Sequence, residues 1–391
     1  MSNDNFKIEN EDFSFLDDDE IDASESLNAV YEPIPSNMDY EPTLVEFGLN
    51  TKLPDLYRKS HKAIFSLHDQ SPHEQNIFNI MNAKMSPTHW ESGKSPIYEF
   101  TAAELSKWLG IEPKHLGTTL KPAAERLSKR SVGFATDDNS EFEFISIFSK
   151  IKYKNAKLTL IPNPLLKDFL MEFSQGYGLI NPYKMIKLKR GYSKRIYEFL
   201  SRFKEDGTYL YPMKLDNLRR YLGLYDKDGN FLEGKKSLKA ASVFITRCLE
   251  ESIEEINELC SDEIIFFEGE AGNLGYTPLK KGRSYVGVKF HYQWLDNKIQ
   301  MSKESALNTI KDLEQKRLVK KEKLSNAELD LLSHAYIKVG MRDKGIQLIK
   351  ILQERAAVVN KLKQEKESKS QELTLLEKIA ELENMAPDVG Y

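Results

Sequence analysis

The segment from Ser237 to Leu259 carries side chains that could read base pairs in DNA. We expect one long helix, because residues suited to a buried face recur at helical spacing; these are Leu238, Ala241, Ile245, Cys248, Leu249, Ser252 and Ile256. That spacing puts Lys239, Val243 and Arg247 outward, flanked by Ala240, Ser242 and Thr246. Arginine forks onto guanine, lysine pairs with guanine or phosphate, and an exposed valine suits the thymine methyl group. A solvated face would more usually carry Glu and Lys with no outward valine, so we interpret this face as a DNA reader.

Two further basic groups lie near this segment. The run Lys280-Lys281-Gly282-Arg283 concentrates three charges at an expected hairpin tip, where a wing reaches phosphates or the minor groove. Four cations precede or begin an earlier helix and are predicted to clamp the DNA backbone; they are Lys189, Arg190, Lys194 and Arg195.

An earlier segment of similar design is a poorer candidate. Its third helix exposes Lys121, Glu125 and Lys129, and a carboxylate that faces phosphate is repelled. We expect either a protein interface or weaker DNA contacts; the candidates for those contacts are Lys114, Thr118, Thr119, Lys129 and Arg130.

Signals of enzymatic chemistry are weak. Gly93-Lys94-Ser95 resembles the end of a phosphate-binding loop, but Thr88 stands where that loop requires glycine. The seven histidines form no metal-binding pair, and Tyr197 and Tyr221 occupy core-like positions. We predict no catalytic residue, no metal and no cofactor, and we interpret the two cysteines, Cys248 and Cys260, as reduced thiols.

The elements that position these residues occur twice. The run Leu105-Ser106-Lys107-Trp108-Leu109-Gly110-Ile111 recurs as Leu218-Arg219-Arg220-Tyr221-Leu222-Gly223-Leu224. Each copy is typical of a short amphipathic helix closed by a left-handed glycine. An apolar helix precedes each copy, and a longer helix and two strand-like runs follow it. This order predicts an α+β fold with two tandem winged helix-turn-helix domains.

In the first copy, capping boxes at Ser71–Glu74 and Thr101–Glu104 predict two helix starts. A third helix is expected to bury Leu120, Ala123, Ala124 and Leu127, with Pro122 in its first turn. The runs 142–148 and 157–161, joined at Lys154-Asn155-Ala156, are expected to form the wing, and Asn163 caps a helix to about Phe173.

In the second copy, residues 175–178 are expected to be a hinge, with the new unit beginning near Asn181-Pro182. Helices are predicted at about 193–203 and 214–222, and strands at 263–268 and 284–294.

Charge is segregated along the chain. Residues 1–50 hold 14 acidic side chains against one lysine, a net charge of −13, whereas residues 180–247 hold 16 basic and 7 acidic side chains, a net charge of +9. We expect residues 1–60 to be a disordered acidic arm, which solubilises the protein, mimics DNA or recruits a partner. Winged-helix domains are expected at 61–175 and 180–298. A helical tail is expected at 301–391, with a helix capped at Ser325 and a short coiled coil near 362–382, and it would serve for linking or oligomerisation.

No stretch approaches the roughly 18 to 20 apolar residues that span a bilayer. The acidic residues at the N-terminus predict no secretory leader there. We expect a bacterial cytoplasmic protein without membrane contact.

An ordered set of motifs resembles one family. Lys194-Arg195-Ile196-Tyr197-Glu198-Phe199-Leu200 is followed by Leu218-Arg219-Arg220-Tyr221-Leu222-Gly223, by Phe244 with Glu254-Glu255-Ile256-Asn257, and by Lys281-Gly282-Arg283. Over about residues 70–295 the chain is similar to plasmid replication initiators of the Initiator Replication protein family. The resemblance implies binding to direct repeats (iterons) at a theta-type origin, opening of that origin, and recruitment of the host helicase and initiator. It also implies monomers that initiate, dimers that often repress, and no catalysis.

One departure bears on the reading helix. Family members tend to carry two or three basic residues just after the equivalent of Phe244, and here Ile245 and Thr246 leave only Arg247. Base readout is therefore expected to lean on Lys239 and the wing.

Two other functions compete with a replication initiator. A winged-helix transcription regulator would also bind operator DNA, and iterons beside an AT-rich segment would separate the two. A relaxase-like enzyme would need a metal site that the sequence does not offer.

Overall fold

The computed structural model describes residues 43–44, 52–66, 69–90, 94–135, 142–204, 210–226, 229–295, 302–355 and 358. Two compact units divide the chain, one up to Gln293 and one from Trp294 onward. The acidic arm as far as residue 42 and the coiled coil expected near 362–382 lie outside the described residues.

The first winged-helix module begins with three helices whose ends follow the expected capping signals. Helix α2 (Pro72–Lys84) is capped by Ser71 and Glu74, and α3 (Ala102–Leu109) by Thr101 and Glu104; both capping boxes are complete. Helix α3 ends at Gly110, which has φ +66°, a conformation that costs glycine little. Helix α4 (Pro113–Ser128) then buries Leu116, Leu120, Ala123 and Leu127.

The expected start of α4 was wrong. Pro122 lies inside the helix rather than in its first turn, because the helix already begins at Pro113. Proline is favoured at a first helical position, where its missing N–H is not needed. Pro113 therefore satisfies that position, and α4 tolerates a second proline further on.

The sheet of the first module has the order β1 (Thr43–Leu44), β3 (Pro96–Thr101), β7 (Lys157–Pro162) and β6 (Phe148–Lys154). The last two strands form the wing. Its turn at Asn155-Ala156 is confirmed, with φ of 51° and 56°, as in the two-residue turns that match strand twist.

The first strand of that wing was wrongly placed. The run Phe142–Ser146 is β5, which pairs with β4 (Ser131–Ala135) in a separate hairpin. The true strand, β6, alternates lysines with other residues and is mostly exposed, so it lacks the apolar content by which strands were sought.

Two predictions at the edges of the first module are corrected. Residues assigned to the acidic arm include β2 (Tyr57–Ser60), and Leu53, Tyr57, Lys59 and Ser60 are all buried. The expected hinge overlaps β8 (Tyr177–Ile180), which pairs antiparallel with β2. Short helices α1 (His61–Phe65) and α5 (Lys167–Met171) pack against β2, and Asn163 caps the 3₁₀ turn (η4, Pro164–Leu166) before α5 as expected.

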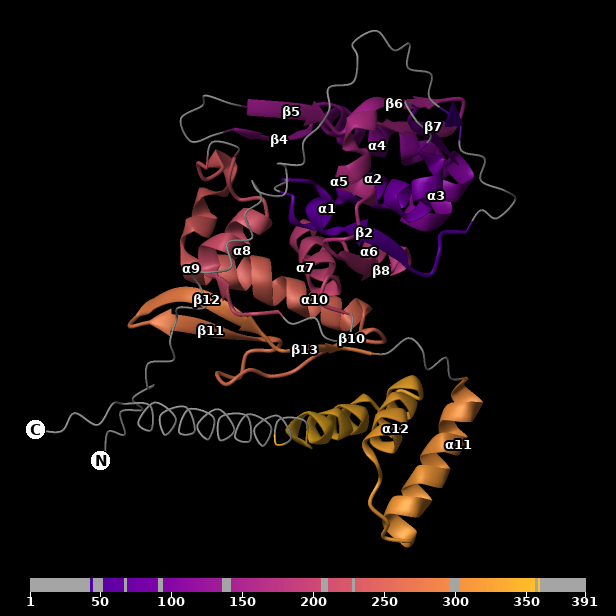
Figure 1. The fold of residues 1–391 in the computed structure, drawn as a ribbon, viewed down its shortest axis with the longest axis vertical. Coiled ribbons are helices and arrows are strands. Elements are labelled where there is room, and N and C mark those ends of the chain that lie inside the picture. The colour runs from indigo at the N-terminus through magenta and orange to yellow at the C-terminus, as the bar shows by residue number, and fades with distance from the viewer. Residues whose placement is uncertain are drawn as a thin grey trace, which may run out of the picture. The chain divides into compact units, whose positions relative to one another are not determined.

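Helix α7 (Gly191–Ser201) is the central element of this unit, as Figure 1 shows. Residues 193–201 are all buried, and the helix packs against α2 and β8 on one side and α10 (Glu251–Leu259) on the other. A short helix that was not predicted, α6 (Pro182–Lys187), precedes it and is capped by Asn181. An amphipathic helix needs one covered face, so complete burial indicates that α7 belongs to both modules.

The second module repeats the first. After β9 (Met213–Lys214), α8 (Leu215–Tyr221) ends near the left-handed Gly223, with φ +71°. The strands β11 (Tyr276–Lys281) and β12 (Ser284–Phe290) form its wing, and the order β11-β12-β9 is the counterpart of β6-β7-β3. Strand β11 was not among the strands predicted from the sequence. Its polar residues pair with β12 through the backbone, which side-chain pattern does not reveal.

Between α8 and the wing lies the third helix of this module. A 3₁₀ segment (η5, Glu233–Lys239) comes first, followed by a run composed of α9 (Ala241–Phe244), a π-helical turn (η6, Ile245–Glu250) and α10. Strand β10 (Ile264–Phe266) then pairs with β13 (Tyr292–Trp294). The two tandem winged helix-turn-helix modules expected from the sequence are thus present.

The C-terminal unit is helical, as expected. Helix α11 (Lys303–Glu314) continues into a π-helical turn (η7, Gln315–Val319), and α12 (Asn326–Lys338) begins at the predicted cap Ser325. Helical residues 342–355 follow, and a small core holds the unit together; its buried members are Leu324, Leu329, Leu332, Tyr336 and Leu348. Among the described residues, no helix combines the length and apolarity needed to cross a membrane.

Candidate nucleic-acid interface

The third helix of the second module presents an exposed polar face. Ser242, Thr246 and Arg247 are exposed and Val243 is half-buried, whereas Phe244 and Cys248 on the other side are fully buried. Arg247 makes no ion pair or hydrogen bond within the described part of the chain, so its guanidinium group is available to a ligand. A free arginine beside two hydroxyls offers the donors that read base edges.

Lys239 does not lie on this helix, so the expected i, i+4, i+8 alignment with Val243 and Arg247 was wrong. The backbone is extended at Ala240, with φ −67° and ψ 120°, and the helix begins only at Ala241. Lys239 ends the 3₁₀ segment, where its carbonyl accepts a hydrogen bond from Arg219 at 2.7 Å and its ammonium group lies over the Phe231 ring. It remains exposed, as a cation beside the start of the helix rather than part of its face.

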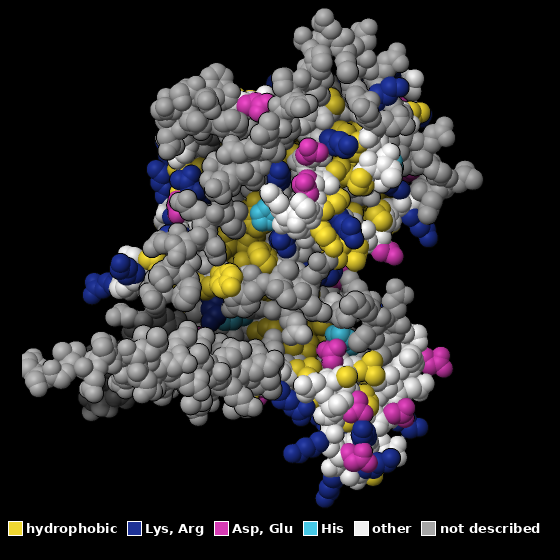
Figure 2. Space-filling view, viewed as in Figure 1, with side chains coloured by type: hydrophobic (Ala, Val, Ile, Leu, Met, Phe, Trp, Pro, Cys, Tyr) yellow, Lys and Arg dark blue, Asp and Glu magenta, His cyan; other side chains and the backbone are white. Residues whose placement is uncertain are grey.

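The wing of the second module carries its charges at the tip, where Figure 2 shows blue side chains. Gly282 has φ +62° in the two-residue turn between Lys281 and Ser284, a conformation that favours glycine. Lys281 and Arg283 are exposed and make no ion pair within the described residues. Lys280 is also exposed, and its ammonium group lies 4.8 Å from the centre of the Tyr285 ring.

Two of the four residues predicted to contact the DNA backbone are exposed, as that prediction requires. Lys189 and Arg190 precede α7, and their backbone N–H groups donate to the Glu255 carboxylate at 2.7 and 3.3 Å. Arg190 also forms an ion pair with Glu251. The Lys189 side chain therefore has no ion pair within the described residues. Arg190 would have to leave the Glu251 carboxylate before it could bind a phosphate.

The prediction that Lys194 and Arg195 clamp DNA is corrected, because both are buried. The Lys194 Nζ donates to Asn76 Oδ1 at 2.8 Å and to the Met185 carbonyl, and burial lowers its pKa to about 7. Sequence spacing could not show this, because it does not reveal that elements from distant parts of the chain bury residues 193–201 of α7.

Arg195 belongs to a buried ion network between the modules. Its guanidinium group lies 3.3 Å from Glu198, which also accepts from Lys59 at 2.7 Å. The same group donates to the Ser66 and Tyr221 carbonyls, each at 2.9 Å, and stacks on the Tyr221 ring. Burial lowers the pKa of Lys59, and the Glu198 carboxylate opposes that shift. These cations hold the protein together rather than bind DNA.

Most cations of the third helix of the first module are paired. Lys114 pairs with Glu112 at 2.8 Å and Lys129 with Glu125 at 2.9 Å, all exposed. Lys121 is exposed and makes no ion pair within the described residues. Thr118 is exposed and donates to the His115 carbonyl, while Thr119 is half-buried. That this helix reads DNA less well stays a prediction.

Arg130, the remaining candidate of the first module, is held by Glu74. Its Nε donates to that carboxylate at 2.7 Å, and Arg126 donates to the same group at 3.1 Å. Burial raises the pKa of Glu74, but hydrogen bonds from Arg130 and Ser71 outweigh it and lower the pKa. Arg130 is therefore a structural cation, which corrects its assignment to DNA.

Sequence reasoning missed the exposed lysines on the wing of the first module. Lys150, Lys152 and Lys154 lie exposed at alternate positions of β6 and make no ion pair within the described residues. Tyr153 packs its ring over Gly117 of α4, where an added Cβ would meet it at 3.4 Å. The signal was available in the alternation of lysines, since side chains two residues apart share one face of a strand.

Groups that could support catalysis are engaged or buried. No cluster of three or more His, Cys, Asp or Glu within the described residues could hold a metal ion. Burial raises the pKa values of Cys248 and Cys260 to about 12, which keeps these free thiols protonated. Tyr197 and Tyr221 are buried as expected, with hydroxyls that donate to Glu263 at 2.6 Å and to the Arg195 carbonyl at 3.0 Å.

The possible end of a phosphate loop gains no support. Gly93 lies outside the described residues. Ser95 is buried, and its hydroxyl donates to the Pro162 carbonyl at 2.6 Å. That hydroxyl is therefore committed to the protein backbone.

Comparisons with known proteins match the arrangement described above. Residues 56–201 match the family model described as Initiator Replication protein, WH1, and residues 214–292 match Initiator Rep protein, WH2. The crystal structure of the Pi initiator protein in complex with iteron DNA is similar at a TM-score of 0.47 and 17% sequence identity, covering 63% of this chain and 99% of that one. A search of curated protein sequences finds no match.

Proposed function

The chain belongs to the Initiator Replication protein family, whose two models together match more than half of it, and we propose that it starts replication as a non-enzymatic origin binder. It is a DNA-binding plasmid replication initiator. In the proposal it binds direct repeats at the origin, helps to open the duplex, and recruits the host helicase and initiator. Some molecules would form homodimers, and all would act in the bacterial cytoplasm, where a plasmid is copied.

One observation carries the proposed mode of binding. Ser242, Thr246 and Arg247 are exposed together on the third helix of the second module, and Arg247 has no partner within the described residues. A helix of this kind enters the major groove, where arginine forks onto guanine and the hydroxyls contact either base type. The half-buried Val243 would meet a thymine methyl group.

The remaining contacts would hold the protein on the backbone. Lys281 and Arg283 on one wing, and Lys150, Lys152 and Lys154 on the other, are exposed cations without ion pairs within the described residues. Phosphate contacts set position and affinity but carry no sequence information. The two modules would therefore contribute differently, with the second reading bases and the first adding phosphate contacts.

Binding to DNA that flanks the coding sequence tests this proposal. Fluorescence anisotropy with a duplex of the candidate repeat, against a scrambled duplex of equal composition, should show specific binding tighter by at least about a thousandfold. Equal affinity for both duplexes would contradict it. Binding to an operator without repeats or an adjacent AT-rich segment would favour a transcription regulator instead.

A second assay tests the non-enzymatic part. The protein with Mg²⁺ or Mn²⁺ should leave supercoiled origin DNA intact and should not hydrolyse ATP. A nicked product, or a covalent tyrosine–DNA adduct, would contradict it.

A further inference from the structure

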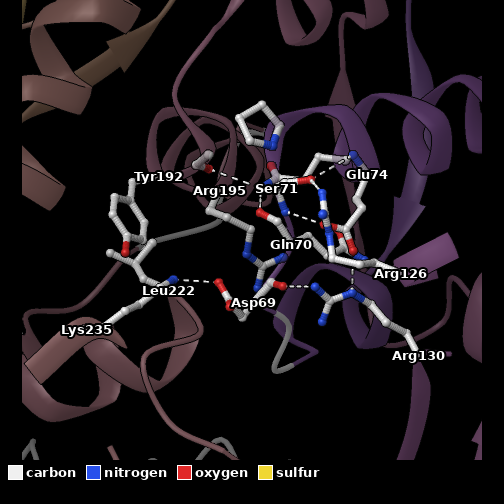
Figure 3. Close-up of a pocket in the computed structure, with 13 residues that line it drawn as sticks. Asp69, Gln70, Ser71, Glu74, Arg126, Arg130, Tyr192, Arg195, Leu222 and Lys235 are labelled. Carbon is white, nitrogen blue, oxygen red and sulfur yellow. Dashed lines mark hydrogen bonds and ion pairs between the residues drawn. The ribbon is translucent and has the colours of Figure 1, made fainter. Parts of the chain in front are cut away.

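A cavity of about 290 Å³ lies where the two modules meet. Its walls come from segments far apart in the sequence: the start of α2, the end of α4, the start of α7 and the 3₁₀ segment η5. Figure 3 shows Lys235 and Tyr192 on one side, Arg126 and Arg130 on the other, and Arg195 between them. No DNA-reading residue predicted from the sequence lines it except Arg130 and Arg195, which are both engaged within the protein.

The cavity has more positive than negative side chains. Four cations line it, namely Arg126, Arg130, Arg195 and Lys235, against the two carboxylates Asp69 and Glu74. Glu74 is shared by two of these arginines, and Asp69 lies 2.5 Å from Lys235. Internal pairing therefore leaves an excess of cationic donors around one partly open pocket.

Two helices also begin at this cavity. The first residues of α2 and α7 line it, and the two helices have 13 and 11 residues. Helix α7 has no side-chain cap for its first N–H groups. The capping box at Ser71 and Glu74 already closes α2, so the uncapped start of α7 is the one that offers N–H donors and a positive potential to an anion.

An unsatisfied buried donor points to a ligand independently of charge. Arg195 is only 4% exposed and lines the cavity, yet its Nε has no hydrogen-bond partner within the described residues. The Nε2 of Gln70, at the same cavity, is also buried without a partner. Buried donors are rarely left unsatisfied, so each such donor calls for an explanation.

We propose that this cavity is an anion site that takes a phosphate group between the two modules. A phosphoryl group offers several acceptor oxygens, which would accept from Arg195 Nε and also from Arg126 and Lys235, cations that now share or pair with the carboxylates of Glu74 and Asp69. Two sources share this chemistry, a free phosphate compound and a DNA backbone phosphate. The second source rests on the proposed function, and the first does not.

Thermal melting of the full chain in inorganic pyrophosphate tests the first source. Sodium chloride at matched ionic strength is the reference. Pyrophosphate at ten times its dissociation constant should raise the melting temperature of the wild type by about 3 °C. Lys235→Gln and Arg126→Gln should abolish this rise, each measured against its own ligand-free value, so that a loss of basal stability does not obscure the result.

The matched control is Lys236→Gln. Lys236 neighbours Lys235 on η5 but pairs with Glu233 on the surface and does not line the cavity. It should keep the full rise. A rise that is equal in the wild type and all three variants would overturn the proposal, because the binding would then lie elsewhere.

The salt dependence of binding to origin DNA tests the second source. If a DNA phosphate enters the cavity, Lys235→Gln and Arg126→Gln should each lower the slope of log affinity against log salt by about one, and Lys236→Gln should not. That result supports the site even without a pyrophosphate effect. No pyrophosphate effect together with unchanged slopes overturns it. Failure of the wild type to bind origin DNA would contradict the proposed function alone, and the pyrophosphate result would then decide the cavity.

Discussion

The two winged-helix modules share a strand order and differ in what their third helices expose. In the first, Lys114 and Lys129 at the two ends of α4 are paired with nearby carboxylates. In the second, Arg247 has no ionic partner within the described residues and lies beside two free hydroxyls. The comparison teaches that a count of cations does not identify a DNA-reading surface, because a paired cation must first give up its carboxylate.

The wings differ less than the helices. Each ends in a two-residue turn, and each carries exposed lysines without ion pairs within the described residues. In the proposed mode of binding, the modules would therefore differ in base reading and agree in backbone binding. Four predictions test this comparison, and the first addresses the ion network that joins the modules.

The largest effect is expected from Glu198→Gln. The change leaves Lys59 and Arg195 buried without their carboxylate, and a broken buried pair costs about 3–5 kcal/mol of unfolding free energy. Urea unfolding would measure it, with the exposed Glu254→Gln on α10 as control. A loss below about 1 kcal/mol would show that the modules are not joined through this network.

Arg247→Ala should separate reading from clamping. Loss of a bidentate base contact should weaken binding to the cognate repeat by about 1–3 kcal/mol and leave random DNA nearly unchanged. Lys129→Ala, on the paired helix of the first module, should have little effect on either DNA. Equal losses for Arg247→Ala on both DNAs, with the fold intact by circular dichroism, would remove the distinction between the modules.

The burial of Lys194 should make the stability of the folded protein depend on pH. Its pKa is about 7 in the folded protein against an ordinary value of 10.5, because burial disfavours the charged form. Between these values the unfolded chain holds a proton that the folded protein has lost, so stability rises with pH across that window. From pH 7 to 9 the wild type should gain about 2 kcal/mol of unfolding free energy relative to Lys194→Met. Urea titrations at pH 7, 8 and 9 measure the difference, and a constant difference would contradict the lowered pKa.

The smallest effect is expected at the wings. Lys152→Ala and Lys281→Ala should each reduce the salt dependence of DNA binding by about one counterion. Each should weaken binding to cognate and random DNA alike. A salt titration of both variants on both DNAs measures this. A loss of affinity that depends on the DNA sequence, in either variant, would mean that the wing reads bases.

Three helix starts and the repeat were readable from local pattern. Ser71, Thr101 and Ser325 cap helices as expected, because capping depends on the side chain and the next few N–H groups. The two left-handed glycines, Gly110 and Gly223, follow from the same local sterics. The third helix of the second module also buried most of its expected face.

The site was only partly readable. The exposure of Ser242, Thr246, Arg247, Lys281 and Arg283 follows from periodicity and turn position. The position of Lys239 could not be predicted in this way, because the extended backbone at Ala240 separates Lys239 from the helix that begins at Ala241. Strand β6 was missed because its lysines face outward and hide its pairing with β7.

Burial and partnership were decided by the tertiary structure alone. Lys194 and Arg195 look like surface cations in the sequence, but α7 is covered by α2 and β8 on one side and α10 on the other. Arg130 meets Glu74, which lies 56 residues earlier in the chain. Capping and periodicity act over one or two helical turns, so residue type and spacing predict them. The environment of a charge depends on elements brought together from distant parts of the chain, and local pattern carries no record of them.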